Sequence, residues 1–426
     1  MNGLSSAEFA PSGKAAVVVS SVFEDTFGLG YLQFKKPGQM SAVKVSGLVH
    51  KGMGELTRLH HLFDDHYLVE YDIDGCSWAY EAVFLEDRLE MRCKHVLVGK
   101  RPMEMGKLEH LDHDEDGDVF AITFSTATSP TQIYTIEGKG RGRTKVHTQE
   151  RILGISRGEL AAGEDASYVS YDGLRVSARL YLPAKRLGYE GPRPVVYYIH
   201  GGPQGQERPD FAWFSMPLIQ FLTLRGFAVF VPNVRGSTGY GLSYVKWVDR
   251  DWGGKDRLDH VHAMTEVLPK DARIDAKRAA VVGRSYGGYM TLMLAGCNPD
   301  LWKAACDMFG PYDLLTFSER IPATWKPYFR IALGDPAKPA EREFLQERSP
   351  KTHLHNMTAP MLVIQGRNDP RVVAAESEDL VRELKASGKQ IELLVFENEG
   401  HDVLKYENRV RCYEAIADFF AKRLHP

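Results

Sequence analysis

The chain has 426 residues and is close to charge neutrality, with 53 lysines and arginines against 56 aspartates and glutamates, a formal net charge of −3. That balance excludes the basic surface expected of a nucleic-acid-binding protein, so no nucleic-acid partner is expected. A hydrophobic fraction of 43% with 26% charged residues is typical of a folded globular protein, and the length suggests two or three domains.

No segment predicts a membrane span or a secretory leader. Apolar runs such as residues 15–19 are far shorter than the roughly 20 residues that cross a bilayer, and residues 1–14 lack a basic stretch followed by an apolar one. The five cysteines are scattered, and no two form a C-x-x-C pair. We therefore expect a reduced, cytoplasmic protein with no membrane partner, disulfide framework, metal site or cofactor; a homo-oligomer is left open.

Residues 1–162 predict an all-β domain. Three stretches, starting at Ser6, Leu62 and Leu111, each combine a turn, an apolar strand and a second strand. Propeller blades recur at about 40–50 residues, so an incomplete, propeller-like arrangement is one interpretation. A small antiparallel sheet without repeat symmetry is the alternative.

Residues 163–426 predict a single α/β domain. A hairpin is expected over residues 168–183, with Asp172 and Gly173 at its turn. Beyond it, apolar strands without polar alternation are expected at residues 195–199, 227–231, 279–282, 361–364 and 391–396, and helices at 258–267, 286–295, 374–386 and 409–424. Such strands are typical of a parallel sheet covered on both faces, whose ligand sites lie at the carboxyl ends of the strands.

A candidate nucleophile stands at one of these strand ends. Ser285 is the centre of Gly283-Arg284-Ser285-Tyr286-Gly287, with an apolar strand before it and an apolar helix after it. In this context the G-x-S-x-G pattern indicates a tight strand-to-helix turn that exposes the serine hydroxyl. The alternative is a glycine-rich turn without chemistry.

A serine hydroxyl needs a base and an orienting acid, which in α/β-hydrolases follow the serine as acid and then histidine. Asp369 follows the strand at 361–364, and His401 follows the strand at 391–396. Asp402 is a rival for the acid, but it shares a loop with the histidine, so Asp369 is preferred. Asp369 alone could be a turn residue, and His401 alone a core histidine.

A second loop is expected to stabilise negative charge at the same site. The strand at 195–199 leads into His200-Gly201-Gly202, the kind of segment that supplies a backbone N–H to an oxyanion hole together with the residue after the nucleophile. We assign these two donors to Gly202 and Tyr286, and expect His200 to brace the loop. A plain turn is the alternative.

Large aromatic residues near the catalytic loops could form a substrate pocket. The candidates are Phe211, Trp213, Trp252, Tyr312 and Trp325. Many buried aromatic residues only fill the core, which is the alternative for each of them.

Together these segments resemble the catalytic domain of the prolyl oligopeptidase family of serine peptidases, on the acylaminoacyl-peptidase and dipeptidyl-aminopeptidase side. The resemblance rests on HGGPQGQ, VPNVRGSTGYG, DWGGKDRLD, VVGRSYGGYMTL, QGRNDPRV and NEGHDVLKYENR, in this order over about residues 165–426. It implies Ser285, Asp369 and His401 as the triad, Tyr286 as an oxyanion donor, and peptides as substrates. It also implies an N-terminal β-propeller.

The N-terminal region departs from that family. A seven- or eight-bladed propeller needs about 300 residues at 40–50 per blade, whereas residues 1–162 hold about three blades, and an open arc would leave edge strands to be paired or covered. The chain is then a shortened form or fragment, or this region is another small β cap. We expect a serine peptidase acting on short peptides. There are two alternatives: a carboxylesterase, and a β-domain interaction protein with a degenerate hydrolase.

Overall fold

The computed structural model describes residues 3–211 and 214–426, which pack into two compact units. The first unit comprises residues 1–157 together with 208–216 and 238–245; the second comprises 158–207, 217–237 and 246–426. Each unit is described by itself. The two short segments of the first unit come from the range 163–426 expected for the α/β domain, so the division in space differs from a single cut in the sequence.

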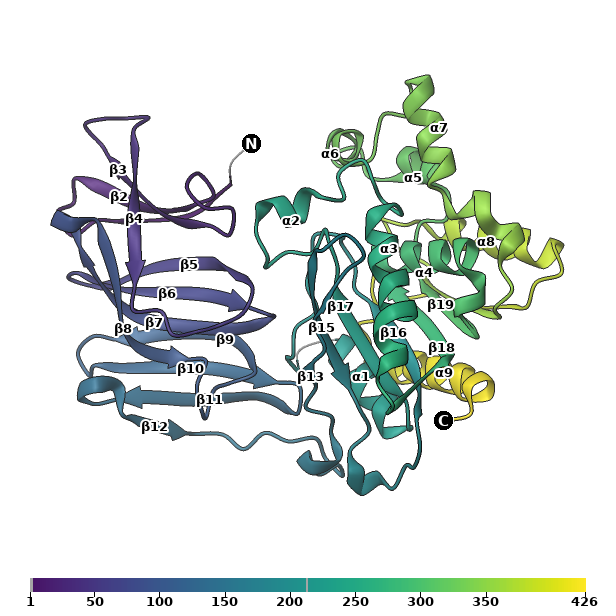
Figure 1. Ribbon diagram of the computed structural model, residues 1–426, viewed down its shortest axis with the longest axis horizontal. Coiled ribbons are helices and arrows are strands. Elements are labelled where there is room, and N and C mark those ends of the chain that lie inside the picture. Colours follow the sequence, from purple (N-terminus) through teal and green to yellow (C-terminus); the bar gives the residue numbers. More distant parts are fainter. Residues whose placement is uncertain (1–2, 212–213) are drawn as a thin grey trace. The chain divides into compact units, whose positions relative to one another are not determined.

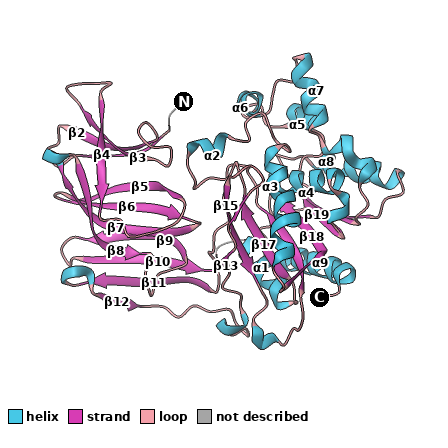
Figure 2. Cartoon of the chain, in the orientation of Figure 1, coloured by secondary structure: helices cyan, strands magenta, loops and turns pink. Residues whose placement is uncertain are grey.

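The first unit is built from three four-stranded antiparallel meanders (Figures 1 and 2). Their strands are β1 (Leu4–Phe9), β2 (Ala15–Ser20), β3 (Gly28–Gln33) and β4 (Met40–Ser46); β5 (Gly54–Phe63), β6 (His66–Ile73), β7 (Cys76–Leu85) and β8 (Glu90–Val98); and β9 (Gly106–Asp114), β10 (Val119–Thr126), β11 (Ser129–Glu137) and β12 (Arg143–Val146). The meanders begin 50 and 52 residues apart, which is the size of a propeller blade. The repeated β unit expected from the sequence is present, with four strands in each repeat.

The first two meanders join into one eight-stranded sheet that nearly closes on itself. Strand β4 pairs in parallel with β8, from Lys44 opposite Glu90 to Ser46 opposite Arg92, and this leaves β1 and β5 as the two edges. Those edges lie against each other: Leu59 N donates to Ser6 Oγ at 3.4 Å. An arc with open edges was expected, but these two edges cover each other, which protects their unpaired backbone groups.

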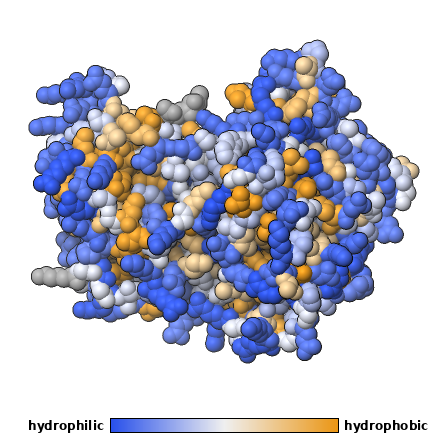
Figure 3. Space-filling view, in the orientation of Figure 1, coloured by the Kyte–Doolittle hydropathy of each residue, from blue (hydrophilic) through white to orange (hydrophobic). Residues whose placement is uncertain are grey.

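Two apolar clusters hold this unit together. One lies within the eight-stranded sheet and includes Val17, Tyr67 and Phe84; the other joins the second and third meanders through residues such as Leu68 and Phe120. Polar contacts also cross from the third meander to the second, because the Arg141 guanidinium donates to Glu81 at 2.7 and 2.8 Å. Figure 3 shows that apolar side chains also remain on the surface of this unit.

The second unit contains a nine-stranded, mainly parallel sheet. Its strands are β13 (Glu164–Asp165), β14 (Tyr168–Val169), β15 (Arg175–Tyr181), β16 (Arg193–Ile199), β17 (Ala228–Asn233), β18 (Ile274–Arg284), β19 (Ala304–Met308), β20 (Met361–Gly366) and β21 (Ile391–Phe396). The order is β13-β15-β17-β16-β18-β19-β20-β21, with β14 paired to β15, and the strands from β17 onward are parallel. The five parallel strands and the hairpin expected from the sequence are confirmed, whereas β19 was not predicted.

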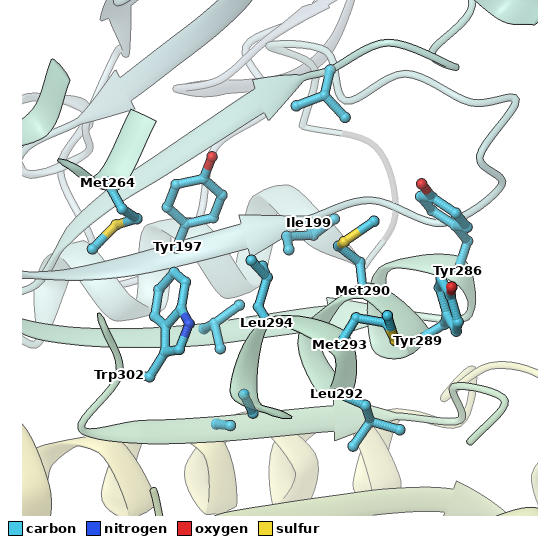
Figure 4. Packing of buried hydrophobic residues seen from close by; sticks show 14 of the residues in the cluster. Tyr197, Ile199, Met264, Tyr286, Tyr289, Met290, Leu292, Met293, Leu294 and Trp302 are labelled. Carbon is cyan, nitrogen blue, oxygen red and sulfur yellow. The ribbon is translucent and has the colours of Figure 1, made fainter. Parts of the chain in front are cut away.

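Helices cover both faces of this sheet. The α-helices of the described residues are α1 (Ser215–Leu224), α2 (Leu242–Lys246), α3 (Lys255–His262), α4 (Tyr286–Cys297), α5 (Leu314–Arg320), α6 (Lys326–Ala332), α7 (Pro339–Glu347), α8 (Ala374–Ala386) and α9 (Tyr406–Leu424); residues 215–216 of α1 and 242–245 of α2 belong to the first unit. Along β18, Ala279 and Val281 join the cluster that α4 buries, and the alternate residues Ala280 and Val282 are buried as well. Figure 4 shows α4 side chains such as Leu294 packed with Tyr197 and Trp302 in that cluster. No helix in the described ranges has the length and apolar character needed to cross a membrane.

Candidate active site

Ser285 occupies a strained turn between β18 and α4. Its backbone has φ 57° and ψ −117°, a conformation that non-glycine residues rarely adopt and that marks functional turns. The neighbouring glycines are required by space: a Cβ on Gly283 would lie 2.1 Å from the Gly287 carbonyl oxygen, and one on Gly287 would lie 2.1 Å from that of Ile199. The G-x-S-x-G pattern therefore has a steric cause, and the turn carries Ser285 at the carboxyl end of the sheet.

The structure brings Ser285, His401 and Asp369 into one hydrogen-bonded chain. His401 Nε2 lies 2.8 Å from Ser285 Oγ, and His401 Nδ1 lies 2.5 Å from Asp369 Oδ2. Because an ionised carboxylate can only accept, Nδ1 carries the hydrogen and Nε2 is left to accept from the serine hydroxyl. This is the tautomer in which an imidazole can act as a base toward Ser285.

Asp369 is held in place by its own loop. Its side chain is fully buried, and its second oxygen, Oδ1, accepts hydrogen bonds from the backbone N–H groups of Arg371 at 2.8 Å and Val372 at 3.0 Å. The rival carboxylate, Asp402, points elsewhere: its Oδ1 lies 3.4 Å from Arg284 Nη1. Burial raises the pKa of Asp402, and the charges of Arg284 and His401 oppose that rise.

The loop after β16 lies directly against the nucleophile. A Cβ on Gly201 would lie 3.3 Å from the Ser285 Cβ, and Gly202 lines the same pocket as Ser285. Tyr286 is the first residue of α4, so its backbone N–H belongs to the first turn, whose donors have no partner within the helix. The ring nitrogens of His200 lie 2.8 Å from the Gly201 carbonyl oxygen and 2.9 Å from Ser237 Oγ, so this histidine braces the loop.

A pocket of about 140 Å³ opens beside Ser285 and His401. Aromatic and apolar side chains form most of its wall, and one cation lies on it. The lining residues are Gly202, Trp252, Ser285, Tyr286, Pro311, Phe317, Trp325, Phe329, Arg371, Val372 and His401. An apolar cavity of about 150 Å³ accepts benzene in other proteins, so this volume suits a side chain with one aromatic ring.

The five aromatic residues expected to form this pocket lie in different places. Trp252 lines the pocket, as expected. Trp325 lines it, with the Arg371 guanidinium 5.3 Å from its ring centroid. Tyr312 is 2% exposed, packs in the core cluster and is not among the lining residues. Phe211 belongs to a segment of the first unit, and Trp213 lies outside the described residues.

Reasoning from the sequence missed several residues of this pocket. Phe317 and Phe329 come from α5 and α6, which were not predicted, and Arg371 and Val372 lie just past Asp369. Asp256 was also missed: it is fully buried and accepts the hydroxyl hydrogen of Tyr286. Burial raises the pKa of Asp256 to about 6, while its hydrogen bonds oppose that rise. The only feature of the sequence that pointed to Arg371 and Asp256 was their position. They fall within QGRNDPRV and DWGGKDRLD, two of the segments on which the family resemblance rests.

The sheet order, the strained serine turn and the ordered Ser285, Asp369 and His401 side chains define an α/β-hydrolase domain. In the described ranges no three histidine, cysteine, aspartate or glutamate side chains gather as a metal ion would require. A family model described as the prolyl oligopeptidase family, a peptidase family, matches residues 212–426. The chain belongs to the prolyl oligopeptidase family.

Relatives of two kinds are similar to the chain. Dipeptidyl aminopeptidase BIII of Pseudoxanthomonas mexicana is 30% identical over 314 residues, which cover 72% of this chain and 44% of the relative. The acylamino-acid-releasing enzyme of Rattus norvegicus is 28% identical over 309 residues, covering 68% and 41%. The chain thus spans less than half the length of these two curated relatives.

Solved structures share the fold. A puromycin-hydrolysing peptidase of Mycobacterium tuberculosis superposes with a TM-score of 0.82 at 23% identity, covering 99% of this chain and 62% of that one. An acylaminoacyl peptidase of Pyrococcus horikoshii superposes with a TM-score of 0.76 at 21% identity, covering 97% of this chain and 62% of that one. At these identities the likeness concerns the fold: an N-terminal β domain followed by an α/β-hydrolase domain.

Proposed function

We propose that this chain is a serine peptidase that hydrolyses short peptides through an acyl-enzyme on Ser285. The observation that carries the proposal is the hydrogen-bonded chain from Ser285 Oγ through His401 to Asp369. It lies beside a pocket whose volume suits a side chain with one aromatic ring. Membership of a peptidase family supports the same reaction class. No cofactor is needed for it, because the nucleophile and the base are both side chains of this chain.

The mechanism follows from the positions of these groups. Ser285 Oγ attacks the carbonyl carbon of the scissile bond while His401 Nε2 takes the hydroxyl proton. Asp369 accepts from Nδ1, so its charge stabilises the imidazolium that forms. The backbone N–H groups assigned to Gly202 and Tyr286 stabilise the negative charge on the carbonyl oxygen. His401 then gives its proton to the leaving amine, and water hydrolyses the acyl-enzyme by the same steps.

The pocket indicates the residue that precedes the cleaved bond. Its wall of Trp252, Phe317, Trp325 and Phe329 favours a single aromatic ring, through apolar burial and edge or face contacts. We therefore propose aromatic residues at this position, with both dipeptidyl and acylaminoacyl substrates as candidates from the two kinds of relatives.

An active-site-directed fluorophosphonate tests whether Ser285 is an activated nucleophile. We expect the folded chain to be labelled at Ser285 alone, and the Ser285→Ala variant to remain unlabelled. Absence of labelling in the folded parent chain would favour the alternative of a degenerate, non-catalytic hydrolase. Labelling that persists in the variant would place the nucleophile elsewhere.

A matched substrate panel separates a peptidase from a carboxylesterase. It contains phenylalanine anilides with a free or acylated amino terminus, their alanine counterparts, and the corresponding aryl esters. We expect turnover of phenylalanine anilides that depends on Ser285. Turnover of the esters alone would make the chain an esterase.

Truncation of the pocket wall should change selectivity. Trp325→Ala removes an indole ring that lines the pocket and that the Arg371 guanidinium stacks on. We expect kcat/KM for the phenylalanine anilide to fall by about tenfold, and that for the alanine anilide to change by less than about twofold, because only the larger side chain reaches the wall. Tyr312→Phe is the matched control, since Tyr312 does not line the pocket. Equal losses on both substrates would contradict this assignment.

A further inference from the structure

An ion pair joins the two residues that flank the nucleophile and the base. Arg284 immediately precedes Ser285, and Asp402 immediately follows His401. Arg284 Nη1 lies 3.4 Å from Asp402 Oδ1, and the two side chains are 17% and 15% exposed. The partners are 118 positions apart in the sequence, so the pair links the turn at the end of β18 to the loop that follows β21.

Among the described residues, no backbone hydrogen bond joins the turn at Ser285 directly to the loop of His401, so this connection depends on side chains. The loop of His401 is bonded to the loop of Asp369, since Arg367 N donates to the Phe396 carbonyl and Asn368 N to the Glu399 carbonyl, both at 2.9 Å. The serine turn is bonded to β19 instead, because Ser285 N donates to the Met308 carbonyl at 2.9 Å. The loops of the acid and the base are thus bonded to each other, whereas the nucleophile follows β18, which β19 separates from β20.

The charges around His401 also follow from this arrangement. The Asp369 carboxylate accepts from Nδ1, Asp402 is the next residue, Arg284 lies against Asp402, and Arg371 lines the same pocket as the imidazole. Phe309 packs against the ring with a centroid distance of 5.0 Å and carries no charge. A carboxylate beside an imidazole favours its protonated form and a guanidinium disfavours it, so Arg284 and Asp402 act in opposite directions.

We infer that Arg284 and Asp402 are positioning residues for the proposed reaction, which tie the base to the nucleophile and balance the charge beside His401. Neither needs to touch the substrate. Their role rests on the proposed function, because it concerns the proton that His401 takes from Ser285. It predicts that removing one member leaves the other as an uncompensated charge beside the base.

The pH profile of kcat/KM, measured on the phenylalanine anilide, distinguishes this role from a purely structural one. Its acid limb reports the protonation of the base in the free enzyme. We expect Asp402→Asn to move this limb to lower pH and Arg284→Met to move it to higher pH, each by about half a pH unit or more. The double variant returns the limb close to that of the parent. Arg284→Lys keeps the positive charge, so among the single variants it should move the acid limb least.

The loss of positioning should appear in kcat. Asp402→Asn and Arg284→Met are each expected to lower the plateau of kcat by about tenfold with KM changed by less than about twofold, because the substrate pocket is intact while the base and nucleophile are less well aligned. The exposed pair Arg225–Asp418, 2.7 Å apart, is the matched control. Arg225→Met and Asp418→Asn should leave both the limb and kcat unchanged.

The outcomes separate this inference from the proposed function. If the parent chain shows no turnover that depends on Ser285, the proposed function is wrong. If the parent is active and the two variants move the acid limb in the same direction, or leave it in place, the inference about Arg284 and Asp402 is wrong. Thermal unfolding of each variant identifies one that fails to fold. If Asp402→Asn is that variant, Arg284→Met must still move the limb to higher pH while Arg284→Lys leaves it close to that of the parent, and equal limbs for the two would overturn the inference.

Discussion

Ser285→Ala is expected to lower kcat for peptide hydrolysis by at least about 10⁴-fold, with little change in thermal stability. The physical reason is that the attacking oxygen itself is removed, so only binding and the oxyanion donors remain to accelerate the attack of water. Initial rates on the phenylalanine anilide, divided by the concentration of folded protein, measure the loss. A residual rate above about one hundredth of the parent value would show that Ser285 is not the nucleophile.

The same kinetics test whether Ser285 and His401 act as one unit. His401→Ala is expected to cost about as much as Ser285→Ala, and the double variant no more than either, because each single change already removes the activated nucleophile. Losses that multiply in the double variant would mean that the two side chains contribute independently, in conflict with the 2.8 Å contact between them.

Asp307→Asn is expected to flatten the pH dependence of stability. Asp307 is fully buried at the end of β19; its Oδ1 accepts from Gly310 N at 2.9 Å, and among the described residues its Oδ2 has no hydrogen-bond partner. Burial raises its pKa from 3.8 to about 8. The folded state therefore keeps the proton while the unfolded chain has already lost it, so the contribution of Asp307 to stability is present below pH 4 and is lost as the pH rises toward 8.

Urea unfolding at a series of pH values measures this effect. Between pH 5 and pH 8 we expect the free energy of unfolding of the parent to fall, relative to that of Asp307→Asn, by on the order of 3 kcal/mol, since one pKa unit corresponds to about 1.4 kcal/mol. Asp418→Asn, on an exposed face of α9, is the control and should run parallel to the parent. Parallel curves for Asp307→Asn and the parent would overturn the prediction.

Local patterns in the sequence were enough to locate much of the α/β fold. Strands β16, β17, β18, β20 and β21 were visible because uninterrupted apolar runs are typical of a sheet buried on both faces. Strand β19 was missed since Asp307 interrupts its apolar run, and a charged residue type in a sequence is read as exposed. Burial, which the residue type alone does not indicate, raises the pKa of Asp307, so the carboxyl is neutral and can occupy a central strand.

The candidate triad residues could likewise be predicted from the sequence, whereas the residues of the pocket wall beside them could not. Ser285, Asp369 and His401 each follow a recognisable strand, and the ends of parallel strands meet at one edge of a sheet. The pocket wall brings together residues from 202 to 401, among them Phe317 and Phe329 on short helices without a clear periodic pattern. Their meeting depends on how those helices pack, which no local pattern specifies.

By itself, then, the sequence located most of the parallel strands, the candidate residues that follow them, and a repeating β unit near the amino terminus, because each follows from short-range patterns of apolar residues, glycines and turns. Only the tertiary structure decided that β4 pairs with β8 and brings β1 against β5, that Tyr312 packs in the core while Trp325 lines the pocket, and that Arg284 meets Asp402. The physical reason is common to all three. Each is a contact between residues far apart in the chain, chosen by packing and by the pairing of buried charges and edges.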